Sequence, residues 1–593
     1  MRIPQRTHLC GDLRRSDHGQ SAVLHGWVET TRDHGGIIFL MLRDRAGKIQ
    51  VVVNPETSEE MAQTAKKIGH EWVITVTGTV ALRDEQHINP ELNTGDIEIV
   101  AETVEILNES KPLPFLIPEP ESASEEVRLK YRYLDLRTRK LQQNLAIRNR
   151  AYQCVRSALV DHGFYEIETP FLMKSTPEGA RDFLVPSRLH KGRFYALPQS
   201  PQTYKQLLMI SGFDRYFQIV KCFRDEDLRA DRQPEFTQID LEMSFVNEEE
   251  VMEIAEVLTV VLYSNLVEVA LERPFRKLTY QEAICRYGMD KPDLRFEMPI
   301  YTVTDILGDS EFRVFQSVYK RGGVIGALCL PDADLSRKDI DRLTEEVKPV
   351  RAQGVAFMKA ASDGVEGGIS KFFAEQEIAD LLREIQPEPG ALLLFIADQP
   401  EIAYPALGKL REYLGQTQGL IDNNAVVPVW VVNFPMFEFN DEENRWEAMH
   451  HPFTAPLPKD LPNLSDNTAE VRARAYDLVI NGQEVAGGSI RNYQLATQER
   501  IFDLLGIGRK ERMEKFGFLL EALEYGAPPH GGIAFGFDRI VALLSGTESI
   551  RNVIAFPKTT SALSLMDGAP SEVDAGQLRE LGLQIIQNSS GSD

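Results

Sequence analysis

The sequence predicts an α+β protein of several domains: a small β-barrel at the N-terminus, a core built on an antiparallel sheet, and an α/β domain inserted into that core. Three observations lead to this prediction. Residues 1–107 contain five short strand-like runs separated by turn residues. The long segment after them mixes strands and helices without the regular βαβ alternation of a doubly wound parallel sheet. The density of motifs falls near residue 293 and rises again near residue 425.

Length and composition agree with a multidomain chain. The 593 residues correspond to about three to four domains at roughly 150 residues each. No apolar run follows the first charged residues, and no apolar stretch is long enough to span a bilayer, so we expect neither a secretory signal nor a membrane segment. The five cysteines are scattered without metal-ligand spacing, which favours a reducing, cytoplasmic location.

The charge distribution bears on the possible partners. A net charge of −24 repels phosphate at long range and argues against indiscriminate nucleic-acid binding. Residues 1–50, however, contain eight Arg or Lys against five Asp or Glu. Local basic patches in this segment could therefore contact a shaped RNA.

The N-terminal segment predicts a closed barrel of the OB type. Its strand-like runs are rich in β-branched and aromatic residues, and Ala46-Gly47 provides a turn between two of them. The expected strands are residues 23–28, 37–42, 49–53, 72–80 and 96–100, and one expected helix, residues 59–68, interrupts them.

Prolines, serines and glutamates mark a linker after the barrel, and two helical stretches follow it at 126–136 and 141–161. The later change of character includes a strand-like run at 323–329 and a helix-like run at 340–347. The resulting division of the chain is 1–107 for the barrel, 108–140 for a linker or hinge, 141–292 and 425–557 for the two parts of the core, 293–424 for the inserted domain, and 558–593 for a C-terminal extension.

A charged loop between two apolar strands is the most informative segment. The strands are expected at 216–223 and 236–245, and the loop from Arg224 to Glu235 contains three arginines and five acidic residues. A charge run of this kind is usually a solvated hairpin. Its position between apolar strands, and the suitability of arginine for bidentate phosphate recognition, favour a phosphate site instead.

Two further segments carry weaker signals. Residues 531–536 form a glycine-rich strand end, and a helix with Arg539 in its first turn follows. Glycines allow close backbone approach to a ligand, although such a turn alone is a weak predictor of a phosphate site. Residues 163–170 join a long helix to a strand that ends at a proline.

Together these segments resemble the three motifs of class II aminoacyl-tRNA synthetases, in the correct order. Motif 1 ends at Pro170, motif 2 is Phe223-Arg224-Asp225-Glu226, and motif 3 is Gly536-Phe537-Asp538-Arg539. Four other segments resemble the bacterial-type aspartyl-tRNA synthetase family specifically. They are residues 177–183, 197–202, 448–453 and 481–485. The resemblance covers nearly the whole chain, barrel and insertion included.

The resemblance implies that L-aspartate is activated with ATP to aspartyl-adenylate and is then transferred to tRNA. Displacement at the α-phosphorus needs positioning and charge neutralisation more than a protein nucleophile. Arg224, Arg539 and Glu484 correspond to the family's catalytic residues. Asp477 and Glu484 resemble its Mg²⁺ ligands, and their carboxylate oxygens suit that ion. The residues implied at the ATP site are Arg224, Asp225, Glu226, Gln233, Glu484, Gly536, Phe537, Asp538 and Arg539.

The same resemblance implies a pocket for aspartate. Arg491 and Lys205 would meet the side-chain carboxylate, and His450 would complete the pocket. An isolated pair such as His450-His451 would more often cap a helix or sit in a core. Asparagine would leave two buried cations uncompensated, and we expect this penalty to exclude it. The implied set is Glu178, Gln202, Lys205, Arg224, Asp240, His450 and Arg491.

In the barrel the resemblance implies contacts to the anticodon. Phe39 would stack on an unstacked base and Gln50 would hydrogen-bond to it, although Phe39 alone would more often be a core residue. Thr30 stands where many family members have arginine, so one contact is lost or replaced. His34 is usually leucine in enzymes restricted to tRNA(Asp), and it implies that tRNA(Asn) is charged too, unless it is simply a polar loop residue. The implied set is Arg32, His34, Phe39, Gln50, Gln86 and Glu98.

The expected partners are tRNA(Asp), tRNA(Asn), L-aspartate and a second copy of the chain, because motif 1 builds the dimer interface in class II enzymes. Two alternatives stay open: an enzyme restricted to tRNA(Asp), and a non-catalytic relative that kept the fold. The presence of Arg224, Arg539 and Glu484 argues against the second. Lysyl and asparaginyl enzymes share the plan, but Arg491 and Lys205 argue against the acidic pocket that lysine would need.

Overall fold

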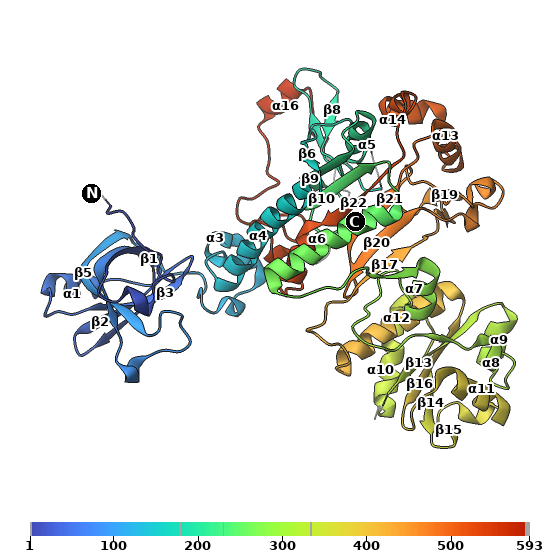
Figure 1. The fold of residues 1–593 in the computed structure, drawn as a ribbon, viewed down its shortest axis with the longest axis horizontal. Coiled ribbons are helices and arrows are strands. Elements are labelled where there is room, and N and C mark those ends of the chain that lie inside the picture. The colour runs from blue at the N-terminus through green and yellow to red at the C-terminus, as the bar shows by residue number, and fades with distance from the viewer. Residues whose placement is uncertain (1–2, 177–178, 229–230, 332–334, 587–593) are drawn as a thin grey trace. The chain divides into compact units, whose positions relative to one another are not determined.

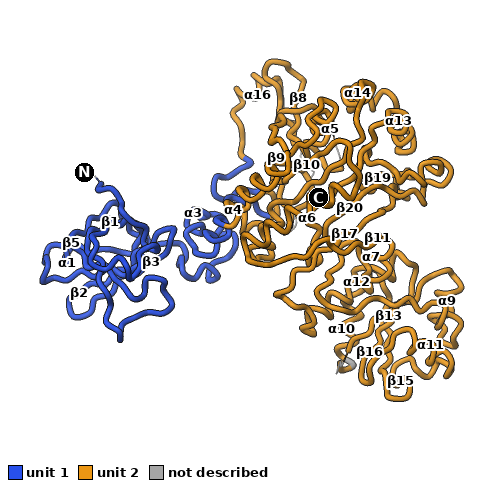
Figure 2. The backbone as a smooth tube through the Cα atoms, in the orientation of Figure 1, with its two compact units in different colours: residues 1–146, 555–559, 563–570 blue, residues 147–554, 560–562, 571–593 orange. Residues whose placement is uncertain are grey.

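The computed structural model describes residues 3–176, 179–228, 231–331 and 335–586. The chain divides into two compact units, which are described separately (Figure 2). The first unit comprises residues 1–146, 555–559 and 563–570, and the second comprises residues 147–554, 560–562 and 571–593.

The first unit contains a closed five-stranded barrel with the order β1-β2-β3-β5-β4, which confirms the predicted OB-type fold. Alternate residues of β1, among them Ala22, Leu24 and Val28, are buried because successive side chains of a strand point to opposite faces. The strands are β1 (Ser21–His34), β2 (Ile37–Asp44), β3 (Gly47–Val53), β4 (Val73–Leu82) and β5 (Ile97–Asn108), and the helix α1 (Glu59–Ala65) ends short of the expected residue 68.

A short helical region follows the barrel, where the sequence predicts a linker and then helices. Phe115, Ile117 and Leu134 form a small apolar cluster of this region. The elements are α2 (Glu125–Lys130), α3 (Arg132–Asp135) and the long helix α4 (Arg139–Asp161).

The second unit is built on an eight-stranded sheet with the order β11-β17-β20-β21-β22-β10-β9-β6 (Figure 1). The predicted antiparallel core is confirmed, and parallel pairs occur only at the two ends of this sheet, between β11 and β17 and between β6 and β9. Its strands are β6 (Tyr165–Glu166), β9 (Arg215–Phe223), β10 (Glu235–Ser244), β11 (Arg276–Thr279), β17 (Pro428–Val432), β20 (Ala475–Ile480), β21 (Gln483–Ile490) and β22 (His530–Gly536).

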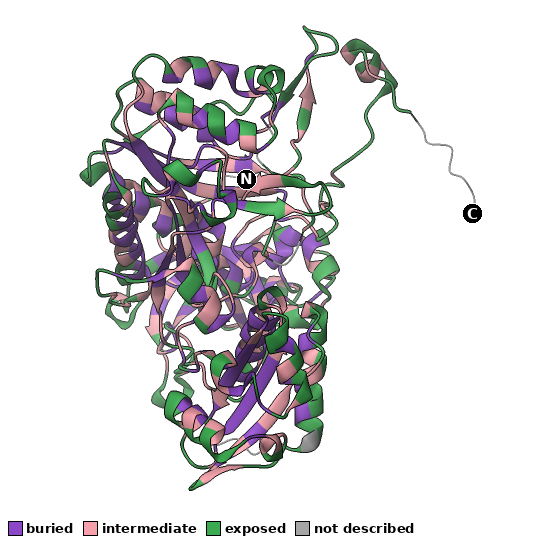
Figure 3. Cartoon of the chain, turned by 90° about the vertical axis from the view of Figure 1, so that its right-hand side faces the viewer, coloured by how far each residue is buried: buried purple, intermediate pink, exposed green. Residues whose placement is uncertain are grey.

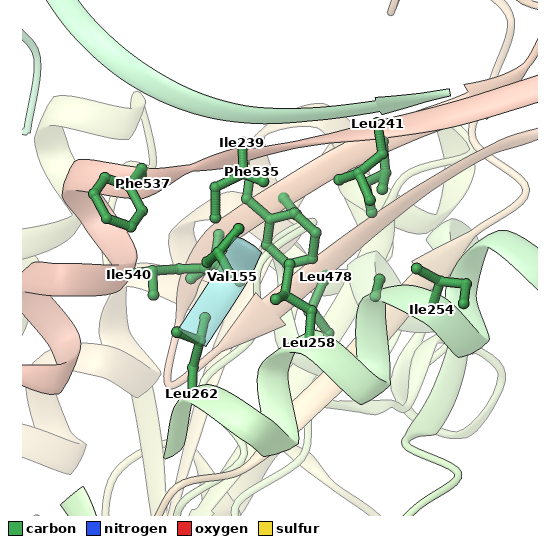
Figure 4. Close-up of a cluster of buried hydrophobic side chains, with 14 of the residues drawn as sticks. Val155, Ile239, Leu241, Ile254, Leu258, Leu262, Leu478, Phe535, Phe537 and Ile540 are labelled. Carbon is green, nitrogen blue, oxygen red and sulfur yellow. The ribbon is translucent and has the colours of Figure 1, made fainter. Parts of the chain in front are cut away.

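Helices cover one face of this sheet and bury its apolar side chains. Leu258 and Leu262 of α6 (Glu248–Val267) join Ile239 and Leu241 of β10 and Val155 of α4 in a single cluster (Figure 4). Burial of each side chain of this size contributes about 1.5–3 kcal/mol to the free energy of folding. The opposite face of β10 is thereby left to carry polar side chains.

The segment between β11 and β17 forms a second, five-stranded sheet with the order β12-β13-β16-β14-β15 and antiparallel pairing. In Figure 3 the strands of this sheet are largely buried and its helices are exposed on their outer faces. Its elements are β12 (Tyr301–Thr302), α8 (Thr304–Leu307), α9 (Arg313–Lys320), β13 (Val324–Leu330), α10 (Arg337–Val347), β14 (Ala356–Ala361), β15 (Gly364–Glu366), α11 (Glu375–Ile385), β16 (Leu392–Asp398) and α12 (Pro400–Thr417).

Helix α10 begins earlier than the expected residue 340. The Ser336 side chain accepts a hydrogen bond from the Asp339 backbone N–H, and Asp339 accepts one in return from the backbone N–H of Ser336. Such a reciprocal cap fixes a helix start, and apolar periodicity does not reveal it.

The remaining elements surround the main sheet. They are β7 (Leu184–Pro186), β8 (Phe194–Ala196), α5 (Gln202–Ile210), α7 (Tyr280–Tyr287), β18 (Phe437–Asn440), β19 (Arg445–Ala448), α13 (Leu495–Leu504), α14 (Arg509–Leu523), α15 (Phe537–Leu544) and α16 (Ala575–Leu581). Within the described ranges, no helix has the length and apolar character needed to cross a membrane. The last residues of the expected C-terminal extension, 587–593, lie outside the described residues.

Candidate active site

The polar face of the main sheet opens into a cavity of about 590 Å³. It is bordered by β10, β21, β22, the loop between β9 and β10, and the start of α5. The residues from the sequence analysis that line it are Gln202, Lys205, Arg224, Glu226, Gln233, Asp240, His450, Glu484, Arg491, Gly536, Asp538 and Arg539.

Three described residues of the expected site do not line this cavity. Among the described residues, Asp225, Asp477 and Phe537 are not part of it. Phe537 is fully buried in the core, where its ring lies 4.5 Å from the ring of Tyr152. Its side chain therefore packs in the core behind the cavity and does not face a ligand. Glu178 lies outside the described residues.

Strand β10 explains how acidic side chains reach the cavity. Residues two apart in a strand share a face, so Gln238, Asp240 and Glu242 point away from the core that Ile239 and Leu241 help to form. Asp240 and Glu242 are both completely buried. Sequence reasoning missed Glu242, although the alternation of polar and apolar residues along β10 is the signal that could have identified it.

Two cations and two carboxylates form a buried network beside the cavity. Lys205 Nζ lies 2.6 Å from Asp240 Oδ1 and 3.2 Å from Glu242 Oε2. Arg491 donates from Nε to Glu242 Oε1 at 3.0 Å and from Nη2 to Glu242 Oε2 at 3.1 Å. Its Nη1 donates to Ser489 Oγ at 2.6 Å. The bidentate contact fixes the orientation of the guanidinium group.

This network changes the expected reason for rejecting asparagine. Lys205 and Arg491 already have carboxylate partners, so the expectation that a neutral ligand would leave them uncompensated is wrong in its simplest form. The expectation fails because Glu242 contacts both cations and partly neutralises each of them. Discrimination must come from the geometry of the remaining donors and from the added attraction of a second carboxylate.

Asp240 Oδ2 and His450 Nε2 are buried atoms of the pocket without a hydrogen-bond partner among the described residues. An unpaired buried polar atom costs about 1–3 kcal/mol, so these atoms are candidates for contact with a ligand. Asp240 Oδ2 can accept a hydrogen bond from an ammonium group. The ring of His450 is held edge-to-face against Phe434, with 4.5 Å between the centroids.

Burial and neighbouring charges set the ionisation of these groups. Burial raises the pKa of Asp240 to about 6, although Lys205 opposes the shift. Burial alone would also raise the pKa of Glu242, but Arg491 and Lys205 outweigh it and lower that pKa to about 2. Burial lowers the pKa of His450 to about 4. Of these three groups, Asp240 and Glu242 are therefore anionic at neutral pH, and the imidazole of His450 is neutral.

At the other end of the cavity three arginines face the same space. The Arg224 guanidinium lies 5.0 Å from the centre of the Phe236 ring, which orients its plane. Arg232 lies 3.4 Å from Glu226, and Arg539 lies 3.7 Å from Asp231. Since these last two ion pairs are partly exposed, each is weak enough to be exchanged for a phosphate contact.

The start of α15 is held from beneath by Arg148 of α4. Arg148 Nη1 lies 2.5 Å from Asp538 Oδ1, and Asp538 Oδ2 accepts the backbone N–H of Thr237 at 2.7 Å. Asp538 thus links α15 to β10, and this position sets the direction of its neighbour Arg539. The guanidinium of Arg539 also donates to the backbone carbonyl of Glu484.

Asp477 and Glu484 approach one another across the hairpin of β20 and β21. A Cβ atom added to Gly487 would lie 2.8 Å from Asp477 Oδ1 and 3.6 Å from Glu484 Oε1. Burial raises the pKa of Asp477 well above its ordinary value, and the charges of Glu484 and Asp290 raise it further. A divalent cation would relieve this repulsion, so the two carboxylates fit Mg²⁺ as partial ligands.

In the barrel unit, some of the expected anticodon residues are half-buried on the strands and the others are exposed. Gln50 on β3 donates from Nε2 to Glu98 Oε2 on β5 at 2.8 Å, and Phe39 pairs in register with Arg32. His34 flanks the turn at Gly35 and Gly36, which both have positive φ. Phe39, Gln50 and Glu98 are half-buried, whereas Arg32, His34 and Gln86 are exposed.

Comparison with known proteins finds a family match for the barrel and another for the part of the chain that contains the main sheet. Residues 124–560 match the family model of class II tRNA synthetases (D, K and N), and residues 22–107 match the OB-fold nucleic acid binding domain. An aspartate–tRNA(Asp/Asn) ligase from Aquifex aeolicus is 52% identical, covering 98% of this chain and 99% of its own. An aspartate–tRNA ligase from Shouchella clausii is 51% identical, covering 99% and 100% respectively.

A solved structure shows the same fold at lower similarity. It is asparaginyl-tRNA synthetase from Pyrococcus horikoshii complexed with asparaginyl-adenylate, with a TM-score of 0.59, 21% identity, and coverage of 94% of this chain and 98% of that chain. The family match spans most of the chain, and the two full-length relatives named above are 52% and 51% identical. The chain therefore belongs to the class II tRNA synthetases (D, K and N), with an N-terminal OB-fold anticodon domain.

Proposed function

We propose that the protein is an aspartate–tRNA ligase, which activates L-aspartate with ATP and transfers it to the 3′ end of tRNA. One observation carries the proposal: the buried Lys205–Asp240–Glu242–Arg491 network borders the same cavity as Arg224, Glu484 and Arg539. The buried network suits an amino acid with a second carboxylate, and the arginines beside it suit phosphate groups. The full-length similarity to aspartate–tRNA ligases supports the same reaction.

In the first step the α-carboxylate of aspartate attacks the α-phosphorus of ATP, and pyrophosphate leaves. Arg224 neutralises the α-phosphate, Arg539 binds the γ-phosphate, and Glu226, Gln233 and the backbone at Gly536 hold the nucleotide. Asp477 and Glu484 would hold Mg²⁺, which neutralises phosphate charge when bound. The protein contributes alignment and charge stabilisation, and no residue needs to act as a nucleophile.

In the second step the ribose hydroxyl at the 3′ end of tRNA attacks the carbonyl carbon of the adenylate. An ester forms, the bond from the carbonyl carbon to the phosphate oxygen breaks, and AMP leaves. The arginine side chains around the phosphate end of the cavity again offset the negative charge of the phosphate groups.

Aspartate itself is recognised by charge and by open hydrogen-bond positions. Arg491, held by Glu242, presents its remaining donor edge to the side-chain carboxylate together with Lys205. Asp240 Oδ2 and the neighbouring Gln202 accept hydrogen bonds from the ammonium group, with Glu178 as the further acidic partner taken from the family resemblance. The neutral ring of His450 closes the pocket against Phe434.

The barrel reads the anticodon in this proposal. Phe39 offers an aromatic face, and the hydrogen-bonded pair Gln50 and Glu98 offers polar edges to a base. His34, exposed beside the β1–β2 turn, tolerates either base at the third anticodon position, so both tRNA(Asp) and tRNA(Asn) are charged. Relatives named aspartate–tRNA(Asp/Asn) ligase support this wider range.

The proposal extends to the organisation of the chain. Residues 1–107 bind the anticodon and 108–140 form a hinge. The catalytic domain comprises 141–292 and 425–557, with the insertion at 293–424 and the extension at 558–593. A homodimer through motif 1 completes the assembly. The cytoplasmic location stays a prediction.

Aminoacylation by the whole chain tests the function. With ATP, Mg²⁺ and a tRNA(Asp) transcript, labelled aspartate should become acid-precipitable with tRNA, and AMP should form in equal amount. Absence of both products under these conditions would favour the non-catalytic alternative.

A further inference from the structure

The hairpin of β20 and β21, which carries Asp477 and Glu484, ends in a tight turn at Asn481 and Gly482. Both residues have positive φ, 53° and 79°, as a two-residue hairpin turn of this type requires. Ile480 pairs with Gln483, and Val479 pairs with Glu484. A shift of this turn would therefore move Glu484 directly.

The chain segments that lead into and out of the five-stranded sheet both contact this turn. On the return side, Asn481 Oδ1 accepts the backbone N–H of Val427 at 2.9 Å, and its Nδ2 donates to the carbonyl of Ala425 at 3.0 Å. On the outgoing side, a Cβ added to Gly482 would lie 3.2 Å from the Cβ of Asp293. The turn thus lies between the two connections.

The outgoing connection is fixed by one buried arginine of α12. Arg411 Nη2 donates to the backbone carbonyls of Asp293 at 2.9 Å and Phe296 at 3.0 Å, and Nε donates to that of Met298 at 2.9 Å. Its guanidinium lies 3.9 Å from the centre of the Phe296 ring. Arg411 is 1% exposed, so these contacts are shielded from water and depend on the planar, forked donor set.

Helix α12 is in turn held against the main core. A Cβ added to Gly288, just after α7, would lie 2.3 Å from the carbonyl oxygen of Tyr404, and one added to Gly408 would lie 2.9 Å from that of Gly288. Only glycine permits this approach of α12 to the end of α7, which lie side by side in Figure 1. The helix therefore provides a rigid support for Arg411.

We propose that Arg411 is a positioning residue for the metal- and ATP-binding hairpin, acting through the loop at Asp293 and the turn at Asn481 and Gly482. This gives the five-stranded segment a role in the adenylation step. The inference rests on the proposed function, because that function assigns Asp477 and Glu484 to Mg²⁺ and ATP. Arg411 itself touches neither substrate.

Binding of Mn²⁺ with a non-hydrolysable ATP analogue, followed by electron paramagnetic resonance on the full-length protein, tests the inference without catalysis. Arg411→Met should weaken Mn²⁺–nucleotide binding about tenfold, as loss of a supporting contact behind metal ligands does. Arg411→Lys keeps the positive charge but not the planar guanidinium donors. Its Mn²⁺–nucleotide affinity should lie between those of Arg411→Met and the wild type. Gln416→Met, an exposed change on the same helix, should match the wild type.

Half-reactions separate positioning from general damage. Arg411→Met should raise the Mg²⁺ concentration for half-maximal ATP–pyrophosphate exchange about tenfold. Transfer of aspartate from preformed aspartyl-adenylate to tRNA should change by less than about twofold, since pyrophosphate has already left. Asn481→Ala, which removes the other attachment of the turn, should reproduce this pattern and replaces Arg411→Met if that variant does not fold.

Wild-type Mn²⁺–nucleotide affinity in both Arg411→Met and Asn481→Ala, or equal losses in the two half-reactions, would overturn the inference. Failure of the proposed function gives a different result, since the unaltered protein would then show no aspartate-dependent exchange. The two failures are therefore distinguishable in one set of experiments.

Discussion

Arg491 holds Glu242 through both carboxylate oxygens, at 3.0 and 3.1 Å, with both side chains buried. The contact is made entirely by protein side chains, and Lys205 shares the same carboxylate at 3.2 Å. The specificity cations are thus fixed in position and charge. The pocket is preorganised, so a ligand need not supply the energy to order these side chains.

Replacement of Arg491 by leucine should abolish aspartate activation while ATP binding persists. Loss of one partner of a buried charge pair costs about 2–5 kcal/mol in binding. Isotope exchange with aspartate and equilibrium binding of ATP measure the two effects. If ATP affinity collapsed and aspartate affinity held, the assigned role of Arg491 would be wrong.

The same variant should lose stability, because Glu242 keeps only Lys205 as a partner. Breaking a buried ion pair costs up to about 3–5 kcal/mol, and the remaining contact with Lys205 reduces this loss, which thermal unfolding would detect. The double variant Arg491→Leu/Glu242→Leu removes the stranded charge, so it should recover much of the stability but none of the aspartate activation. This control separates folding from recognition.

Glu484→Gln should slow adenylation more than transfer. The change removes one of the two carboxylate charges that fit Mg²⁺, and pyrophosphate has left before the transfer step. Single-turnover rates of the two half-reactions test this expectation. Equal losses in both would argue against a metal role confined to adenylation.

The aspartate KM in ATP–pyrophosphate exchange should rise as the pH falls below about 6, the raised pKa of Asp240. The protonated acid cannot serve as the anionic partner of the ammonium group, so KM should increase about tenfold per pH unit below that value. The KM for ATP, measured over the same pH range, serves as the control. A flat aspartate KM between pH 7 and 5 would contradict the role of Asp240.

His34→Leu should restrict charging to tRNA(Asp). His34 is exposed beside the β1–β2 turn, where a donor, an acceptor or a stacking face can accommodate either third anticodon base. Aminoacylation of the two tRNA transcripts, side by side, measures the ratio. Wild-type charging of tRNA(Asn) at under about a hundredth of the cognate efficiency, a gap of roughly 2.7 kcal/mol, would refute dual specificity.

The alternation of apolar residues was sufficient for the barrel and the antiparallel core, and the family resemblance identified twelve of the residues that line the cavity. The sequence was insufficient where function depends on pairing across the fold. Glu242 meets Arg491 only through strand pairing, and Phe537 supports the site only because α15 turns its ring into the core. The contact of Arg411 with the loop at Asp293 spans more than a hundred residues, which no local pattern indicates.

Amino-acid-dependent ATP–pyrophosphate exchange, compared for aspartate and asparagine on the unaltered full-length protein, tests the central claim most directly. Asparagine lacks the charge that Arg491 and Lys205 are positioned to meet. The account predicts exchange with aspartate and a kcat/KM for asparagine at least about a hundredfold lower, or roughly 2.7 kcal/mol. Equal exchange with both amino acids, or exchange with neither, would contradict it.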